Sequence, residues 1–179
     1  MTFIAINLLC PAVLAIHNID EYSRYDDFVR AHHSRLLTKL TARRVVRNAA
    51  ILLTLAVAVL TGLTYIRQSA VLVTLSKVAV FAILLNGIGH CALSLKRRKL
   101  DPGTLSAVAL VMPYSFVSIV AMRSSFGDSF WSLLPCAIYG ALAIPLATLS
   151  FLWIGYGFAY LAARTQNGSD SSVSRIQRD

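Results

Sequence analysis

The sequence predicts an all-α membrane protein, a bundle of about five transmembrane helices with the N-terminus outside the cell and the C-terminus in the cytosol. Of its 179 residues, 56% are hydrophobic and only 14% are charged, whereas a soluble domain is about half apolar and a quarter charged. Several apolar runs reach the roughly 18 residues that a helix needs to cross a bilayer. These runs are rich in Leu and Ala, which favours a helical bundle over a barrel.

The first apolar run is too short to cross the membrane without its polar end. It is strongly apolar only from Phe3 to Ile16, about 21 Å of helix, although the hydrocarbon core is about 30 Å thick. A helix that continues to Tyr22 reaches that thickness. We therefore expect His17, Asp20 and Glu21 to lie inside the membrane rather than in a solvated loop.

Four further spans are predicted at about 46–66, 71–95, 104–122 and 130–163. The last is longer than one crossing needs, and Gly140 and Pro145 could bend it. The basic stretch 23–47 fits either an interfacial amphipathic helix or a solvated loop. The expected organisation is one transmembrane domain over residues 1–163 and a disordered cytosolic tail over 164–179.

The distribution of basic residues predicts the orientation. Fourteen Lys and Arg residues lie in 24–47, 96–99 and the tail, against three on the opposite side, of which Lys77 is expected to snorkel to the interface. These residues flank apolar segments, so the net charge of +9 indicates membrane topology and not nucleic-acid binding. The three cysteines lie singly in apolar segments, which supports neither a zinc knuckle nor a disulfide framework.

Two histidines on different spans are expected at the same depth. His17 lies seven residues before Arg24, about 10 Å of helix, and His90 lies six residues before Lys96, about 9 Å. Helical spacing places Asp20 and Glu21 on the face of His17, and Asn86 one turn before His90. Ionisable groups at this depth are costly unless they pair, face water or bind an ion. The alternatives are a functional His/carboxylate site and a structural set of hydrogen bonds between helices.

The segment Asp101-Pro102-Gly103-Thr104 opens the fourth span. Asp at the N-cap followed by Pro suits a helix start, and the glycine permits a close approach. A second interpretation is that free amides there face an anion beside His90. Other polar residues are weaker candidates, because solvation explains His32 and His33, while ordinary helix packing explains Tyr114 and Ser118.

The same residues carry a resemblance to a known family. The stretch His17-Asn18-Ile19-Asp20-Glu21 resembles the signature of the HXXEE-domain family of bacterial integral membrane proteins. Residues 86–90 and 101–104 are similar to that family's Asn-x-x-x-His and Pro-Gly-x-Thr elements, in the same order. Asp20 departs from the pattern, because it stands where the family has its first Glu. The resemblance implies a polar site of His17, Asp20, Glu21, Asn86 and His90 in a multi-pass protein of the bacterial cytoplasmic (inner) membrane.

These observations lead to three hypotheses of function. The first is a metal-assisted hydrolase or transferase on a lipid-like substrate, with His17, Glu21 and His90 as ligands of a divalent metal such as zinc and Asp20, Glu21 and Asn86 in catalytic roles. The second is a small ion- or proton-coupled transporter. The third is a non-catalytic membrane partner. Beyond the lipid bilayer and a lipid-like substrate, no partner is predicted, and the oligomeric state stays open.

Overall fold

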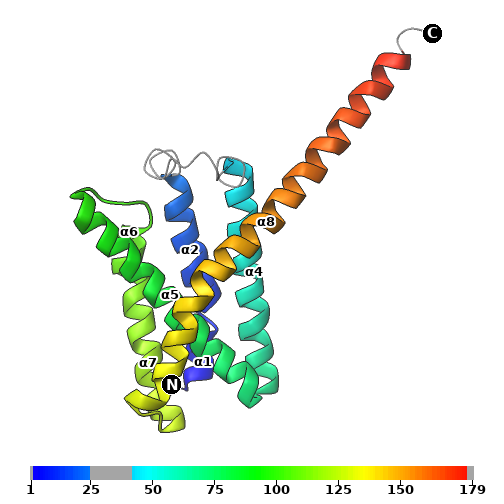
Figure 1. Cartoon of the computed structure of the whole chain (residues 1–179). Helices are drawn as coiled ribbons and strands as arrows, with labels where there is room; N and C mark the ends of the chain where they lie inside the picture. The colour runs from blue at the N-terminus through cyan, green and yellow to red at the C-terminus, as the bar shows by residue number, and fades with distance from the viewer. Residues whose placement is uncertain (1, 25–41, 177–179) are drawn as a thin grey trace.

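The computed structural model describes residues 2–24 and 42–176, with side chains described up to residue 162, and these residues form a bundle of helices without strands (Figure 1). Five helical segments are long and apolar enough to cross a membrane, which confirms the predicted fold class. The predicted interfacial helix lies largely outside the described residues, as do His32 and His33. The helices are α1 (Phe3–Asn7), α2 (Cys10–Ser23), α4 (Arg43–Arg67), α5 (Ala70–Arg97), α6 (Thr104–Ser106), the π-helix η1 (Ala107–Val111), α7 (Met112–Phe126) and α8 (Phe130–Ile176).

The first span consists of two helices in line, α1 and α2. The interruption falls at Leu8 and Leu9, just before Pro11 in the first turn of α2. Proline has no backbone N–H to donate to the preceding turn, so a helix start is the position where it costs least. The helix then continues to Ser23, which confirms that the polar residues at its end belong to the span.

The fourth span runs from Thr104 to Phe126 and contains a π-helical turn. This turn, η1, ends at Val111, two residues before Pro113, whose missing N–H breaks the regular ladder of hydrogen bonds. η1 packs on α5 at Gly87, where an added Cβ would lie 3.2 Å from Val111 Cγ1 and 3.4 Å from Ala107 Cβ. The small residue therefore permits the close approach of the third and fourth spans.

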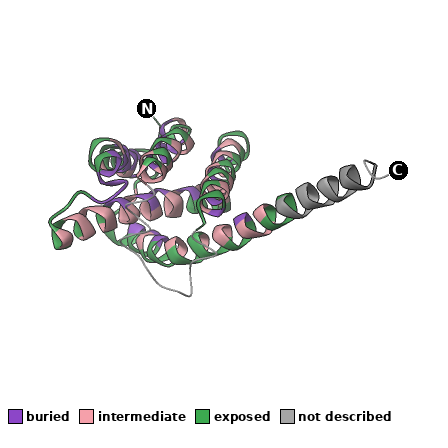
Figure 2. Cartoon of the chain, turned by 90° about the horizontal axis from the view of Figure 1, so that it is seen from above, coloured by how far each residue is buried: buried purple, intermediate pink, exposed green. Residues whose placement is uncertain are grey.

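The last helix, α8, crosses α4 and α5 obliquely and then extends away from the bundle (Figures 1 and 2). It touches both partners through glycines. A Cβ on Gly140 would lie 2.8 Å from the backbone nitrogen of Ala82, and one on Gly155 would lie 2.7 Å from the carbonyl oxygen of Val45. The backbone is helical to Ile176, and the disorder expected from residue 164 stays a prediction.

Large apolar side chains cover much of the outer surface of the bundle. Leu95 is 80% exposed, Trp131 is 76% exposed and Ile66 is 74% exposed. Exposure on this scale is unusual in water and ordinary in lipid, where the solvent is itself apolar. The interior, by contrast, holds several buried polar residues, among them His17 and Asn7. We therefore expect any reactive or ligand-binding groups to lie in the interior of the bundle and not on its outer surface.

Candidate metal centre

The end of α2 and the last third of α5 bring three ligand-type side chains together. Glu21 Oε1 lies 2.5 Å from His90 Nε2 and 3.4 Å from His17 Nε2. The two imidazole rings meet edge to face with their centroids 5.1 Å apart, so the two histidines do share one depth. His17 is buried, while Glu21 keeps about a third of its side chain exposed and forms the open side of the cluster.

Asn86 lies one turn before His90 and contacts both imidazoles. Its side-chain nitrogen donates to Nε2 of His17 at 3.0 Å and lies 3.4 Å from Nε2 of His90. The geometry is consistent with His90 donating its Nε2 proton to Glu21 while His17 Nε2 accepts from Asn86. Asn86 therefore holds the ring of His17 with its unprotonated nitrogen facing the cluster.

A chain of hydrogen bonds behind His17 fixes the opposite face of its ring. His17 Nδ1 lies 2.9 Å from the hydroxyl of Ser106, and that hydroxyl lies 2.8 Å from Asp20 Oδ2. The Ser106 backbone N–H also donates to Asp20 Oδ2, at 3.1 Å. An ionised carboxylate only accepts, so the hydroxyl donates to Asp20 and accepts from His17 Nδ1–H. This arrangement keeps the proton on Nδ1 and leaves Nε2 as a lone-pair donor.

The connection between α5 and α6 closes over the cluster at Gly103. This residue has φ +82°, and an added Cβ would lie 2.8 Å from Glu21 Cγ and 3.1 Å from His17 Cε1. The predicted close approach of the glycine is confirmed. Only a residue without a side chain fits this combination of left-handed backbone and contact.

The predicted N-cap role of Asp101 is wrong. Gly103 occupies the N-cap position of α6, and Asp101 instead accepts two hydrogen bonds from Arg97 at 2.8 and 3.2 Å. Its backbone N–H donates to Ser94, whose hydroxyl in turn lies 2.7 Å from that of Thr104. These bonds fasten the connection to the end of α5. Near this helix start, the backbone N–H of Ser106 donates to the carboxylate of Asp20. The anion at this position is therefore a side chain of the same chain.

The three ligand-type residues fit a small divalent cation. His17, Glu21 and His90 offer one atom each, and these atoms all lie within 4.8 Å of one another. With bonds of about 2.0–2.1 Å, tetrahedral zinc needs ligand atoms roughly 3.3 Å apart. The His17–Glu21 distance of 3.4 Å already matches this, and His90 and Glu21 would separate by about 1 Å as the cation replaces their shared proton.

Ser106 is the site residue that the sequence analysis missed. It lies in the fourth span, 86 residues after Asp20 and without a motif of its own. Its position two residues after the Pro-Gly-x-Thr element was the available signal. Tyr114 and Ser118 are buried further along the same span and do not join the cluster.

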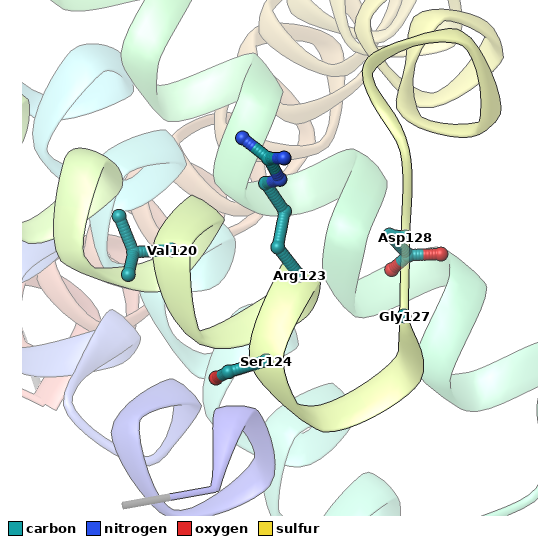
Figure 3. Close-up of a pocket in the computed structure, with 5 residues that line it drawn as sticks. All are labelled: Val120, Arg123, Ser124, Gly127 and Asp128. Atoms are coloured by element: carbon teal, nitrogen blue, oxygen red, sulfur yellow. The ribbon is translucent and has the colours of Figure 1, made fainter.

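The opposite end of the bundle carries a separate set of charges. Lys77 lies 2.5 Å from Asp128 and over the ring of Phe126, so it pairs instead of snorkelling alone. A surface hollow beside this pair is lined by Arg123 and Ser124 from the last turns of α7 and by Asp128 from the connection that follows (Figure 3). Lys77 precedes His90 by thirteen residues of one helix, about 20 Å, so the two polar regions are distinct.

An apolar cavity of about 460 Å³ reaches the cluster from the interior of the bundle. It lies between α2, α4, α5 and α8, and Glu21, Asn86 and His90 form part of its wall. Apolar pockets that end in a few convergent polar groups are the usual form of a small-molecule site. The cluster is therefore connected to a space in which a substrate could lie.

The fold and the cluster together define a polytopic helical membrane protein with a His/Glu site at one end of its bundle. The family model described as a protein of unknown function with HXXEE motif matches residues 8–118, and the chain belongs to this family. The matched segment contains the whole cluster, from His17 to Ser106. Comparisons with curated proteins and with solved structures found no match.

Proposed function

We propose that this protein is a membrane-embedded, metal-assisted hydrolase or transferase that acts on the polar head of a lipid-like substrate. The observation that carries the proposal is the convergence of His17, Glu21 and His90 at the polar end of an apolar cavity. Two imidazoles and one carboxylate are the protein ligands of several catalytic zinc sites, in which the fourth position is left for water or substrate. The partly exposed side of Glu21 is where that position would lie.

Each polar side chain has a role in this proposal. His17 and His90 bind the cation through Nε2, and Glu21 binds it through Oε1. Asp20 and Ser106 act through His17, because they hold its proton on Nδ1. Asn86 donates to His17 Nε2 before a cation binds, and once the cation takes that lone pair, its N–H is free to donate to a carbonyl or phosphoryl oxygen of the substrate. A divalent cation would supply Lewis-acid polarisation of that oxygen and an activated water.

Metal content is the direct test. We expect the purified, detergent-solubilised protein to contain about one divalent ion per chain by elemental analysis, as a three-ligand site requires. His17→Ala and His90→Ala should each lose the ion, and Glu21→Gln should lose it while keeping the size of the side chain. His33→Ala is the matched histidine control, because it lies outside the proposed ligand set.

The outcome also separates the proposal from a structural role of the cluster. If the wild-type protein contains no metal after purification without chelator, the hydrolase proposal is rejected. Loss of thermal stability in His17→Ala without any loss of metal would instead indicate a non-catalytic cluster that joins α2, α5 and the fourth span. Loss of metal with retained insertion supports a screen for hydrolysis of lipid esters and phosphoesters.

One observation favours a transporter as the second candidate. The part of the bundle remote from the cluster also contains polar groups. Asn7 and Ser115 are buried there without a side-chain hydrogen-bond partner among the described residues. Unpaired polar atoms in a membrane interior mark places where water or an ion can lie. Proton flux in proteoliposomes that disappears in His17→Ala and Asn7→Leu, but not in Thr54→Val, would favour this function over hydrolysis.

A further inference from the structure

The cavity beside the cluster has its polar groups mostly at one end. Asn18, Glu21, Asn86 and His90 line it where it meets the cluster, and Leu60 of α4 and Leu75 of α5 line its far end. Between these ends the wall is apolar except for Thr148 of α8. A ligand that fits this distribution has one polar head and one long hydrocarbon tail.

The length of the cavity exceeds one leaflet of a bilayer. His90 and Leu75 are fifteen residues apart on α5, which corresponds to about 22 Å of helix. Half of the hydrocarbon core is only about 15 Å thick. A ligand that fills the cavity therefore needs a long chain in an extended conformation.

The volume of the cavity is large enough for a long chain. At about 460 Å³ it lies within the range of about 300–1,000 Å³ that is typical of ligand pockets. Small side chains make this room, since the wall contains Ala49, Ala50, Ala79, Ala82, Ala143 and Ala147.

Helix α8 keeps the space open because it contacts the bundle on both sides of it. Gly140 touches α5 at Phe81 and Ala82, and Gly155 touches α4 at Val45 and Ala49. The α8 residues that line the cavity, from Ala143 to Leu152, lie between these two contacts. The two contacts together fix the distance between the middle of α8 and the helices it faces, and this distance keeps the cavity open.

We propose that this cavity binds a long, linear acyl chain whose ester or phosphate head lies at Glu21 and His90. The identity of the chain as part of a substrate rests on the proposed function, whereas its binding in the cavity does not. The polar end suits a carbonyl or phosphoryl oxygen once a cation is held by the histidines.

Photo-cross-linking tests the position of the chain. The probe is a palmitoyl monoacyl phospholipid with a diazirine near its methyl end, added to the full-length protein in nanodiscs. We expect cross-links on peptides containing Leu60 or Leu75, at the end remote from the cluster. A second probe with its diazirine beside the carbonyl should label the peptides around Ile83 and Asn86.

Two variants narrow the cavity from different walls. Ala147→Phe on α8 and Ala79→Leu on α5 should each lower cross-linking at the remote end at least tenfold. Ala141→Phe is the matched control, because Ala141 is exposed on the same helix and does not line the cavity. Equal yields in all three variants, or labelling only of lipid-facing surfaces, would overturn the proposal.

His17→Ala separates this inference from the metal hypothesis. The variant should lose the metal and still be cross-linked at Leu60 and Leu75, because His17 is a proposed ligand that does not line the cavity. Absence of metal in the wild type with position-specific cross-linking would reject the hydrolase and keep the chain site. Metal binding without position-specific cross-linking would reject the chain site and keep the hydrolase proposal.

Discussion

Two neighbouring carboxylates on α2 have different partners although they are adjacent in sequence. Successive residues of a helix point about 100° apart, so Asp20 faces Ser106 of the fourth span while Glu21 faces His90 of α5. The departure from the family pattern, Asp in place of the first Glu, falls on the residue that contacts Ser106 and not on the one that contacts both histidines. A shorter side chain at position 20 is therefore compatible with an intact ligand set.

The hydroxyl of Ser106 should determine how tightly the cluster binds metal. Ser106→Ala removes the hydrogen-bond partner of His17 Nδ1, so the ring can rotate and exchange tautomers. Loss of such a contact typically lowers metal affinity by about 10–100-fold. We expect this decrease in a competition titration with a zinc chelator, and recovery in Ser106→Thr. Ser115→Ala is the control, because that buried serine of the same span has no hydrogen-bond partner among the described residues. Equal affinities in the two alanine variants would contradict the assigned role.

Gly103 should tolerate no side chain. Gly103→Ala combines a left-handed backbone, which costs an L-residue about 1–2 kcal/mol, with a Cβ only 2.8 Å from Glu21 Cγ. Gly127 is a matched control, because it also has positive φ but open space around its Cα. We expect both variants to melt at lower temperature, Gly103→Ala by more, and only Gly103→Ala to lose metal. Equal melting temperatures with metal retained in both would show that the connection does not press on the cluster.

At the scale of whole helices, the spans were predictable from hydropathy, whereas their contacts were not. The predicted span 71–95 is observed as Ala70–Arg97, and 104–122 as Thr104–Phe126. Sequence spacing also predicted that His17 and His90 lie at the same depth, and their rings do meet. This was possible because depth in a membrane follows from counting residues from the nearest charge. The contact of His17 with Ser106 depends on the relative rotation of two helices separated by 89 residues, and no spacing rule encodes that rotation.

The contact of α8 with α5 should depend on Gly140. Gly140→Ala places a Cβ 2.8 Å from the backbone nitrogen of Ala82, so α8 has to move outward and loses packing. Gly157→Ala on the same helix meets nothing within 4 Å and should gain up to about 1 kcal/mol from helix propensity. Thermal unfolding in one detergent should therefore rank Gly157→Ala above wild type and Gly140→Ala below it. The opposite order would show that α8 does not pack on α5 as described.

At the scale of the whole molecule, the cluster lies at the end of the bundle that carries most of the basic residues. Arg24 and Arg43 bound the first connection at this end, and Lys96 to Lys99 begin the second, whereas Arg67, Lys77 and Arg123 lie at the opposite end. Positively charged connections are retained in the cytosol during insertion. The orientation that follows would expose the cluster to cytosolic water, metal and co-substrates, while the cavity extends from the cluster between α2, α4, α5 and α8.

This orientation predicts the side from which each connection can be labelled. In a background with Cys10, Cys91 and Cys136 replaced by alanine, Ser129→Cys lies between α7 and α8, and Lys99→Cys lies between α5 and α6, beside the cluster. Both positions are exposed, so burial does not bias the comparison. A membrane-impermeant maleimide should label Ser129→Cys in intact cells and Lys99→Cys only after permeabilisation, because the predicted orientation places the basic connection in the cytosol. The reverse pattern would place the His/Glu cluster at the outer face, and the proposed enzyme would then have to take its metal and its co-substrate from outside the cell.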